Sequence, residues 1–136
     1  MAIASNHLPA ARTIRSFPFA LDAAVVAVAG SALALGASWL GRHLAIDATV
    51  LRTVGVLLLP WAGWVAGVSL RPRLWSMRTV IVGNLLWAAG SIVVLIAGTL
   101  TPNAIGAALI VLQALAVVAL AGWQILASRS SIVVRR

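Results

Sequence analysis

The residues of this chain that could do chemistry are few, and most of them lie outside its apolar segments. The sequence has two acidic residues, Asp22 and Asp47, two histidines and no cysteine. Without cysteine there is no disulfide, no thiolate metal site and no cysteine nucleophile. His7 and His43 both lie outside the apolar segments, so no imidazole is available inside them to bind haem or a metal. We therefore expect no metal, no cofactor and no enzymatic activity.

Asp22 is the exception, because it lies inside an apolar segment, and so do several uncharged polar residues. Polar side chains in lipid are costly and normally face the interior of a helix bundle. At 1.5 Å per residue, Asp22, Asn84 and Gln124 all lie roughly 6–8 Å below the same membrane boundary. We expect a hydrogen-bonded cluster at that level. The predicted intramembrane polar residues are Asp22, Asn84, Gln124, Gln113 and Ser91, the last two lying nearer the midplane.

The segments that must position these side chains are four long apolar runs. They cover about residues 18–40, 50–70, 80–98 and 103–127, and each has the roughly 17–25 residues that a helix needs to cross a bilayer. The chain has 136 residues, of which 62% are hydrophobic and 9% charged. The connections are short, so consecutive helices should be antiparallel neighbours. We predict an all-α fold, an integral membrane four-helix bundle with up-down-up-down topology.

Three regions follow from this reading. They are an N-terminal segment, residues 1–16, a four-transmembrane-helix domain, residues 17–128, and a basic C-terminal tail, residues 129–136. We expect the first span to be retained rather than cleaved as a signal peptide. Its apolar stretch is longer than that of a signal peptide, and it carries an acidic residue.

The cations indicate orientation rather than nucleic-acid binding. The formal net charge is +8, and ten arginines carry the positive charge. Two of them, Arg42 and Arg52, flank the spans on one side and the other eight on the opposite side. This positive-inside bias predicts that both termini are cytoplasmic, in a bacterial inner membrane. Arg71, Arg73 and Arg78 should contact anionic lipid headgroups.

Small residues and helix-capping residues complete the predicted packing. We expect Gly63, Gly67, Ala29 and Gly36 to line close helix contacts, since small side chains let membrane helices approach. Asp47 can cap the second helix, Ser76 the third, and Thr101-Pro102 the fourth. Arg52 should bind Asp47 or a lipid headgroup.

Three tryptophans lie deeper than an interfacial belt requires. Trp61, Trp64 and Trp87 could line a site for a lipid or an apolar ring such as a quinone, or could simply fill space between helices.

The spacing of several motifs resembles that of a family of small, uncharacterised bacterial inner-membrane proteins with four helices. The resemblance covers about residues 17–127, and it implies a four-helix fold without an assigned activity. The matching residues are Asp22, Leu51-Arg52-Thr53-Val54-Gly55, Asn84-Leu85-Leu86-Trp87, Ser91, Leu112-Gln113-Ala114 and Gln124.

Three functions remain open from the sequence. The leading hypothesis is a non-catalytic membrane protein that acts through helix contacts, as an accessory or assembly subunit of a larger complex, respiratory or photosynthetic for example, or as a homo-oligomer. The second is a small proton-coupled transporter that uses Asp22. The third is a lipid- or quinone-binding module. The expected partners are bilayer lipids with anionic headgroups and other membrane subunits or a second copy, and not nucleic acid.

Overall fold

The computed structural model describes residues 8–129, with side chains from residue 16 onward, and this part of the chain is built of α-helices. The helices are α1 (Leu8–Leu44), α2 (Ala48–Leu70), α3 (Leu74–Ile96) and α4 (Ala104–Arg129). Each is long and apolar enough to cross a membrane, α1 from Ser16 onward. The prediction of an all-α fold with four potential spans is confirmed. Residues 1–7 and 130–136 of the predicted terminal segments lie outside the described part.

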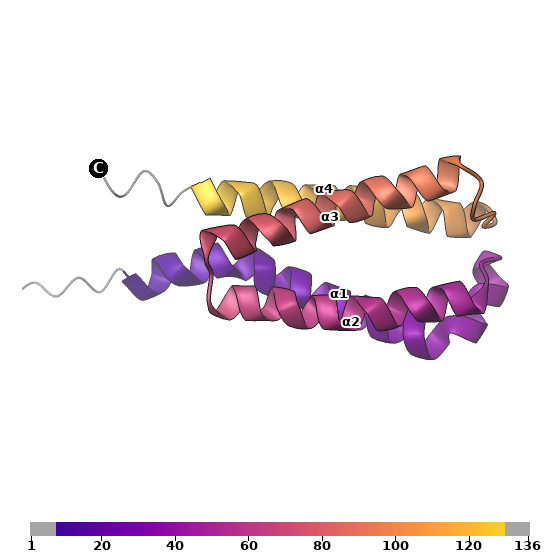
Figure 1. The fold of residues 1–136 in the computed structure, drawn as a ribbon, viewed down its shortest axis with the longest axis horizontal. Coiled ribbons are helices and arrows are strands. Elements are labelled where there is room, and N and C mark those ends of the chain that lie inside the picture. Colours follow the sequence, from indigo (N-terminus) through magenta and orange to yellow (C-terminus); the bar gives the residue numbers. More distant parts are fainter. Residues whose placement is uncertain (1–7, 130–136) are drawn as a thin grey trace, which may run out of the picture.

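The four helices lie lengthwise beside one another (Figure 1). The α1–α2 and α3–α4 connections lie at one end of the molecule, and the α2–α3 connection lies at the other (Figure 1). We call this second end the basic end, because Arg71, Arg73 and Arg78 flank the α2–α3 connection and Arg129 ends α4. The other end is called the opposite end.

The helix boundaries differ from the apolar runs most at the starts of α1 and α3. α1 begins at Leu8 and continues through Pro18, and α3 begins at Leu74, six residues before the third apolar run. A helix is defined by backbone hydrogen bonds, so it extends beyond the apolar residues that would contact lipid. Pro18 removes one such bond without ending the helix.

Capping followed the prediction at one helix and departed from it at two. Asp47 caps α2, and its Oδ1 accepts the N–H groups of Thr49 (2.7 Å) and Val50 (3.2 Å). Ser76 does not cap α3. It lies inside the first turn and donates its hydroxyl hydrogen to the carbonyl oxygen of Arg73 at 2.9 Å. At α4 the capping residue is Asn103 rather than Thr101-Pro102, because only Asn103 has a side-chain oxygen within reach of the first turn, at the N–H of Gly106.

The helices pack as two hairpins. α1 packs along α2, and α3 along α4, while α1 and α4 form a smaller contact and the backbones of α2 and α3 come close at few positions. One apolar cluster contains residues from all four helices: Phe19, Ala23, Val65, Val68, Met77, Val80, Ile81 and Ala121. A second cluster is centred on Ala37, Ile46 and Leu51. The space between α2 and α3 is therefore the least tightly closed side of the bundle.

The close contact between α1 and α2 is made by glycines that the predicted packing set did not include. A Cβ atom built on Gly55 would lie 2.7 Å from the carbonyl oxygen of Gly30 and would also meet the backbone nitrogen of Ala34. The buried face of α1 carries Ala23, Gly30 and Ala37, which are spaced by seven residues and so return to nearly the same side.

The predicted packing residues do not lie in helix contacts, and that prediction was wrong. Ala29 is exposed, and a Cβ on Gly36 would meet only the side chain of Leu40 in its own helix. A Cβ on Gly63 or Gly67 would meet nothing within 4 Å. Ala29 and Gly36 each lie one residue before the buried Gly30 and Ala37, so they are about 100° around α1 from the face that meets α2.

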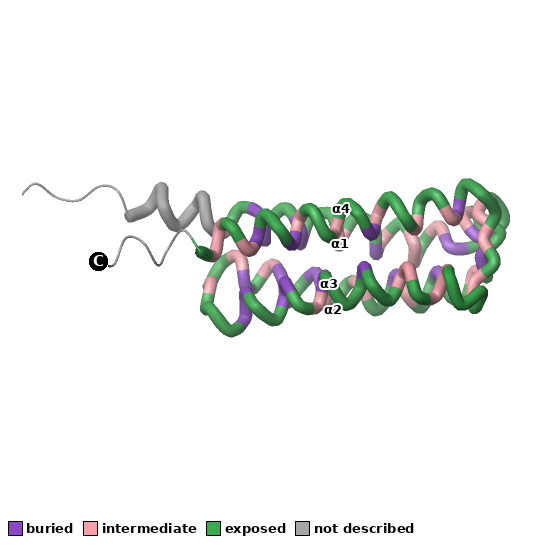
Figure 2. The backbone as a smooth tube through the Cα atoms, turned by 90° about the horizontal axis from the view of Figure 1, so that it is seen from above, coloured by how far each residue is buried: buried purple, intermediate pink, exposed green. Residues whose placement is uncertain are grey.

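The outer surface of the bundle is largely apolar. Buried positions follow narrow stripes on the inward sides of the helices, and most of the remaining surface is exposed (Figure 2). Large aliphatic residues are among the most exposed, including Leu35 at 88% and Ile96 at 80%. An apolar surface of this extent is what a helix bundle presents to lipid.

Candidate functional site

Three polar side chains from three helices meet inside the bundle. Asn84 Nδ2 on α3 donates hydrogen bonds to Asp22 Oδ2 on α1 at 2.6 Å and to Gln124 Oε1 on α4 at 3.3 Å. Gln124 Nε2 donates to the same Asp22 oxygen at 2.8 Å. Each residue thus bonds to both others, and we call this closed set the polar triad.

The triad is shielded from the surface. Asp22 is 2% exposed, Asn84 4% and Gln124 0%. Its immediate neighbours in sequence, Ala23 on α1 and Ile125 on α4 among them, belong to the four-helix apolar cluster or pack against it. α2 contributes apolar residues to that cluster and no member of the triad. The triad is a polar island inside an apolar core.

The hydrogen bonds of this arrangement join α1, α3 and α4, and we call such a cross-link between helices a helix clamp. Asp22 is an acceptor in both of its bonds, and both donors are amide nitrogens. Among the described residues there is no group of three His, Cys, Asp or Glu side chains able to hold a metal ion. With no second acid or imidazole in the triad, the arrangement can hold three helices in register, and it contains no acid–base pair.

The sequence placed Asp22, Asn84 and Gln124 together by depth, and the structure brings these three into contact. Gln113 and Ser91, which were predicted nearer the midplane, do not join the triad. Gln113 Oε1 instead accepts a hydrogen bond from Trp87 Nε1 at 3.1 Å. Ser91 donates to the backbone carbonyl of Trp87 at 2.8 Å, within its own helix. The polar residues of α3 and α4 therefore form two separate contacts.

Arg52 does not bind Asp47, which was one of its two expected partners. Its Nη2 donates to Ser38 Oγ on α1 at 3.3 Å. The carboxylate of Asp47 is used instead to cap α2, where it accepts two backbone N–H groups. These two bonds lower the pKa of Asp47 below its ordinary value, because they stabilise the ionised carboxylate.

The three deep tryptophans do not share a single site. The ring of Trp61 packs on α3 at Gly83, where a Cβ atom would lie 2.5 Å from the ring. Trp87 is 40% exposed and binds Gln113. Trp64 lies beside Trp75, with the ring centroids 5.9 Å apart. Two of the three therefore make helix contacts, whereas Trp64 borders an open space beside Trp75.

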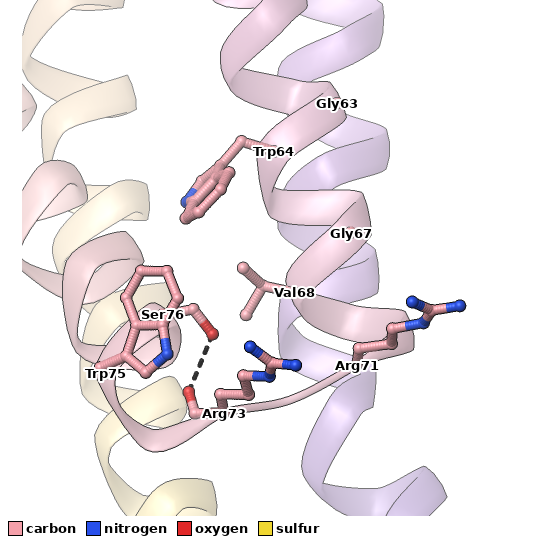
Figure 3. A pocket seen from close by; sticks show the side chains of 8 residues that line it. All are labelled: Gly63, Trp64, Gly67, Val68, Arg71, Arg73, Trp75 and Ser76. Atoms are coloured by element: carbon pink, nitrogen blue, oxygen red, sulfur yellow. Dashed lines mark hydrogen bonds between the residues drawn. The ribbon is translucent and has the colours of Figure 1, made fainter.

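That open space is a hollow of about 270 Å³ between α2 and α3 at the basic end. Figure 3 shows the rings of Trp64 and Trp75 on one side of it, the helical turn of Gly63 and Gly67 on another, and Arg73 extending beneath Val68. Its remaining lining residues are Arg71 and Ser76. The two glycines that the sequence assigned to helix packing therefore border a hollow instead.

Asn103 is a contact residue that sequence reasoning missed. Its Nδ2 donates to the carbonyl oxygen of His43 at 2.7 Å, and its backbone N–H donates to that of Leu44 at 3.0 Å. Its Oδ1 also accepts the N–H of Gly106 at 2.9 Å. One asparagine thus caps α4 and ties its start to the end of α1. An asparagine directly before an apolar run is the signal that could have identified this cap.

The fold and the triad define a class, that of all-α proteins whose four helices are long and apolar enough to cross a membrane several times. Comparison with protein-family models, with curated proteins and with solved structures finds no match to this chain. The resemblance to small four-helix inner-membrane proteins stays a prediction.

Proposed function

We propose that this chain is a non-catalytic integral membrane protein that acts through helix contacts, either as a homo-oligomer or as an accessory subunit of a larger membrane complex. The observation that carries the proposal is the polar triad. Asp22 is the one ionisable side chain that is buried among residues 16–129, and two amides of the same chain donate hydrogen bonds to its Oδ2. A site for chemistry would leave such a group accessible to a substrate.

The shape of the bundle supports the same proposal. Large apolar side chains remain uncovered on the outer faces of the bundle, among them Leu35 on α1 and Ile96 on α3. Gly90 on α3 is exposed and has free space where a Cβ atom would be. Small residues on an outer face let another membrane helix approach closely.

We further propose that the helices alternate in direction across a bacterial inner membrane, with both termini in the cytoplasm. Arg71, Arg73 and Arg78 at the basic end, against Arg42 and Arg52 at the opposite end, support this orientation under the positive-inside rule. A reporter that is active only outside the cytoplasm, fused at the C-terminus, should be inactive. An active reporter would contradict the orientation.

Purification tests the main proposal. The tagged full chain, extracted in a mild detergent, should elute with a second copy or with other membrane subunits, as identified by native mass spectrometry. Gly90→Leu, at an exposed position where a Cβ atom would meet nothing within 4 Å, is a first probe of the contact surface. Recovery of the wild-type chain as a lone monomer across several mild detergents would count against the proposal.

A proton-coupled transporter is the second candidate, and the supporting observation is the position of an acidic residue inside the bundle. In that case Asp22 would have to release its two amide partners during each cycle. The Asp22→Asn variant keeps an acceptor oxygen but cannot exchange a proton. If it leaves efflux, uptake and drug tolerance unchanged, the transporter candidate is excluded.

A further inference from the structure

We propose that the hollow between α2 and α3 at the basic end is a binding site for one anionic phospholipid. The lipid phosphate would bind Arg73, with Arg71 at the mouth, and the upper part of one acyl chain would lie along α2 over Gly67 and Gly63. This inference goes beyond helix contacts and requires only that the bundle lies in a bilayer.

The shape of the hollow fits the top of a lipid. Gly63 lies eight residues before Arg71, which corresponds to about 12 Å along α2 at 1.5 Å per residue. The hollow therefore runs from the basic end into the depth at which acyl chains begin. Its volume, about 270 Å³, is just below the roughly 300–1,000 Å³ of pockets that enclose a whole small molecule. It can hold a headgroup and part of one chain, with the rest of the lipid outside.

The residues change character along the hollow in the order that a lipid requires. Trp64 and Trp75 lie side by side and offer flat apolar surfaces, and tryptophan is typical of the depth at which headgroups meet acyl chains. Gly63 and Gly67 leave the surface of α2 open. At the end of the hollow, the Arg73 side chain extends between the helices, whereas Arg71 points outward (Figure 3).

The charge of the site selects an anionic lipid. Both cations of the hollow are guanidinium groups, which bind phosphate oxygens in a bidentate manner. No acidic residue lines the hollow, and Ser76 already donates its hydroxyl to the Arg73 carbonyl oxygen. The phosphate of an anionic lipid therefore gains a charge-assisted hydrogen bond to arginine. In a zwitterionic lipid, the cation of the headgroup reduces this gain.

A second copy of the chain fits the hollow less well than a lipid does. A parallel copy would bring its own basic end, with Arg71, Arg73 and Arg78, to the same level. Like charges facing each other across an interface oppose association. A negatively charged occupant would neutralise the arginines of the hollow. In a bilayer, the abundant negatively charged molecule at this depth is a phospholipid.

Native mass spectrometry of the full chain tests the site. The delipidated protein is titrated separately with a phosphatidylglycerol, with a phosphatidylcholine of the same acyl chains, and with inorganic phosphate. We expect one phosphatidylglycerol to be retained per chain, with affinity about tenfold higher than for phosphatidylcholine. Arg73→Gln should weaken this binding about fivefold, and Arg71→Gln less, consistent with about 1 kcal/mol per cation near a membrane surface.

The chain offers matched controls. Arg129→Gln removes an exposed cation at the same end but outside the hollow, and should leave binding unchanged. Gly67→Leu fills the hollow, whereas Gly122→Leu adds the same side chain elsewhere, and neither Cβ meets another atom within 4 Å. Gly67→Leu should abolish retention of the lipid, and Gly122→Leu should not. Unchanged helix content and melting temperature would show that both variants fold.

Several outcomes would overturn the proposal. These are equal retention of both lipids, equal loss with Arg129→Gln and Arg73→Gln, or displacement of the lipid by millimolar inorganic phosphate, which would indicate a simple anion site. A change in oligomeric state with Gly67→Leu, without a change in lipid binding, would assign the hollow to another helix. The oligomeric state of the wild type decides the proposed function separately, so each proposal can fail alone.

Discussion

Gly30 on α1 and Gly55 on α2 lie where the backbones of two helices come into direct contact. The Cβ that Gly30 lacks would lie 3.0 Å from the Gly55 carbonyl oxygen, and a Cβ on Gly55 would lie 2.7 Å from the Gly30 carbonyl oxygen. A Cβ atom is therefore excluded at Gly55 and would be crowded at Gly30. This contact explains why α1 and α2 form the most extensive helix pair of the bundle.

Gly55→Ala should destabilise the protein by about 1–3 kcal/mol, the usual cost of forcing an extra methyl group into a packed contact. The methyl group would meet backbone atoms of Gly30 and Ala34, which cannot rotate away as a flexible side chain can. The measurement is thermal unfolding in a mild detergent. Gly122→Ala, at a position with free space, is the control and should be neutral or stabilising by up to about 1 kcal/mol. Equal melting temperatures for the two variants would contradict the contact.

These glycines show what the sequence can and cannot predict. Four apolar runs of spanning length predict the helices, because bilayer thickness fixes the length that is needed. The sequence does not fix which small residues meet, since α1 and α2 are rich in them on several faces. Gly63-x-x-x-Gly67 has the spacing of a packing motif, but Gly30 and Gly55 make the contact. The rotation of α1 that places Gly30 against α2 also turns Asp22 towards α3 and α4.

Asn103→Ala should cost about 1 kcal/mol, with 2 kcal/mol as an upper value, because it removes the cap of α4. It also removes the bond from Asn103 Nδ2 to the carbonyl oxygen of His43, which ties α4 to α1. Thr101→Ala is the control, since Thr101 lies two residues earlier and is exposed. Unfolding curves of the two variants in the same detergent would make the comparison. A larger loss of stability for Thr101→Ala than for Asn103→Ala would indicate that Thr101 caps α4, as the sequence predicted.

Stability should depend on the ionisation of Asp47 in acid. The pKa of Asp47 is lowered from 3.8, first by the bond from the N–H of Val50 and then by that from Thr49. The folded state thus binds a proton less readily than the unfolded state does. The contribution of Asp47 is complete above pH 3.8 and is lost as the pH falls through the lowered value.

The Asp47→Asn variant separates this effect from other acid effects, because asparagine also caps helices but does not ionise in this range. The difference in melting temperature between wild type and Asp47→Asn should be constant above pH 4 and should change below it. Asp47→Ala should be less stable than both at neutral pH. A constant difference between wild type and Asp47→Asn down to pH 2 would contradict the prediction.

The polar triad was the part of the site that depth and helical spacing could predict. Three polar side chains at one level of an apolar bundle have few partners except one another. The separate pairing of Trp87 with Gln113 could not be predicted in the same way, since it depends on the rotation of α3 against α4. The hollow was also beyond the sequence, because it exists where α2 and α3 fail to pack.

Substitutions in the triad should separate a helix clamp from a proton site. Asp22→Leu removes the acceptor of both amide donors and should destabilise the bundle by about 1–2 kcal/mol, the range for polar contacts between membrane helices. Asp22→Asn should cost clearly less, because its side-chain oxygen can still accept from Asn84 and Gln124. A double-mutant cycle with Asn84→Leu should give a coupling energy of about 0.5 kcal/mol or more, since the two residues are in direct contact. Additive losses in that cycle would mean that Asp22 and Asn84 do not stabilise each other, and the helix-clamp interpretation would then be wrong.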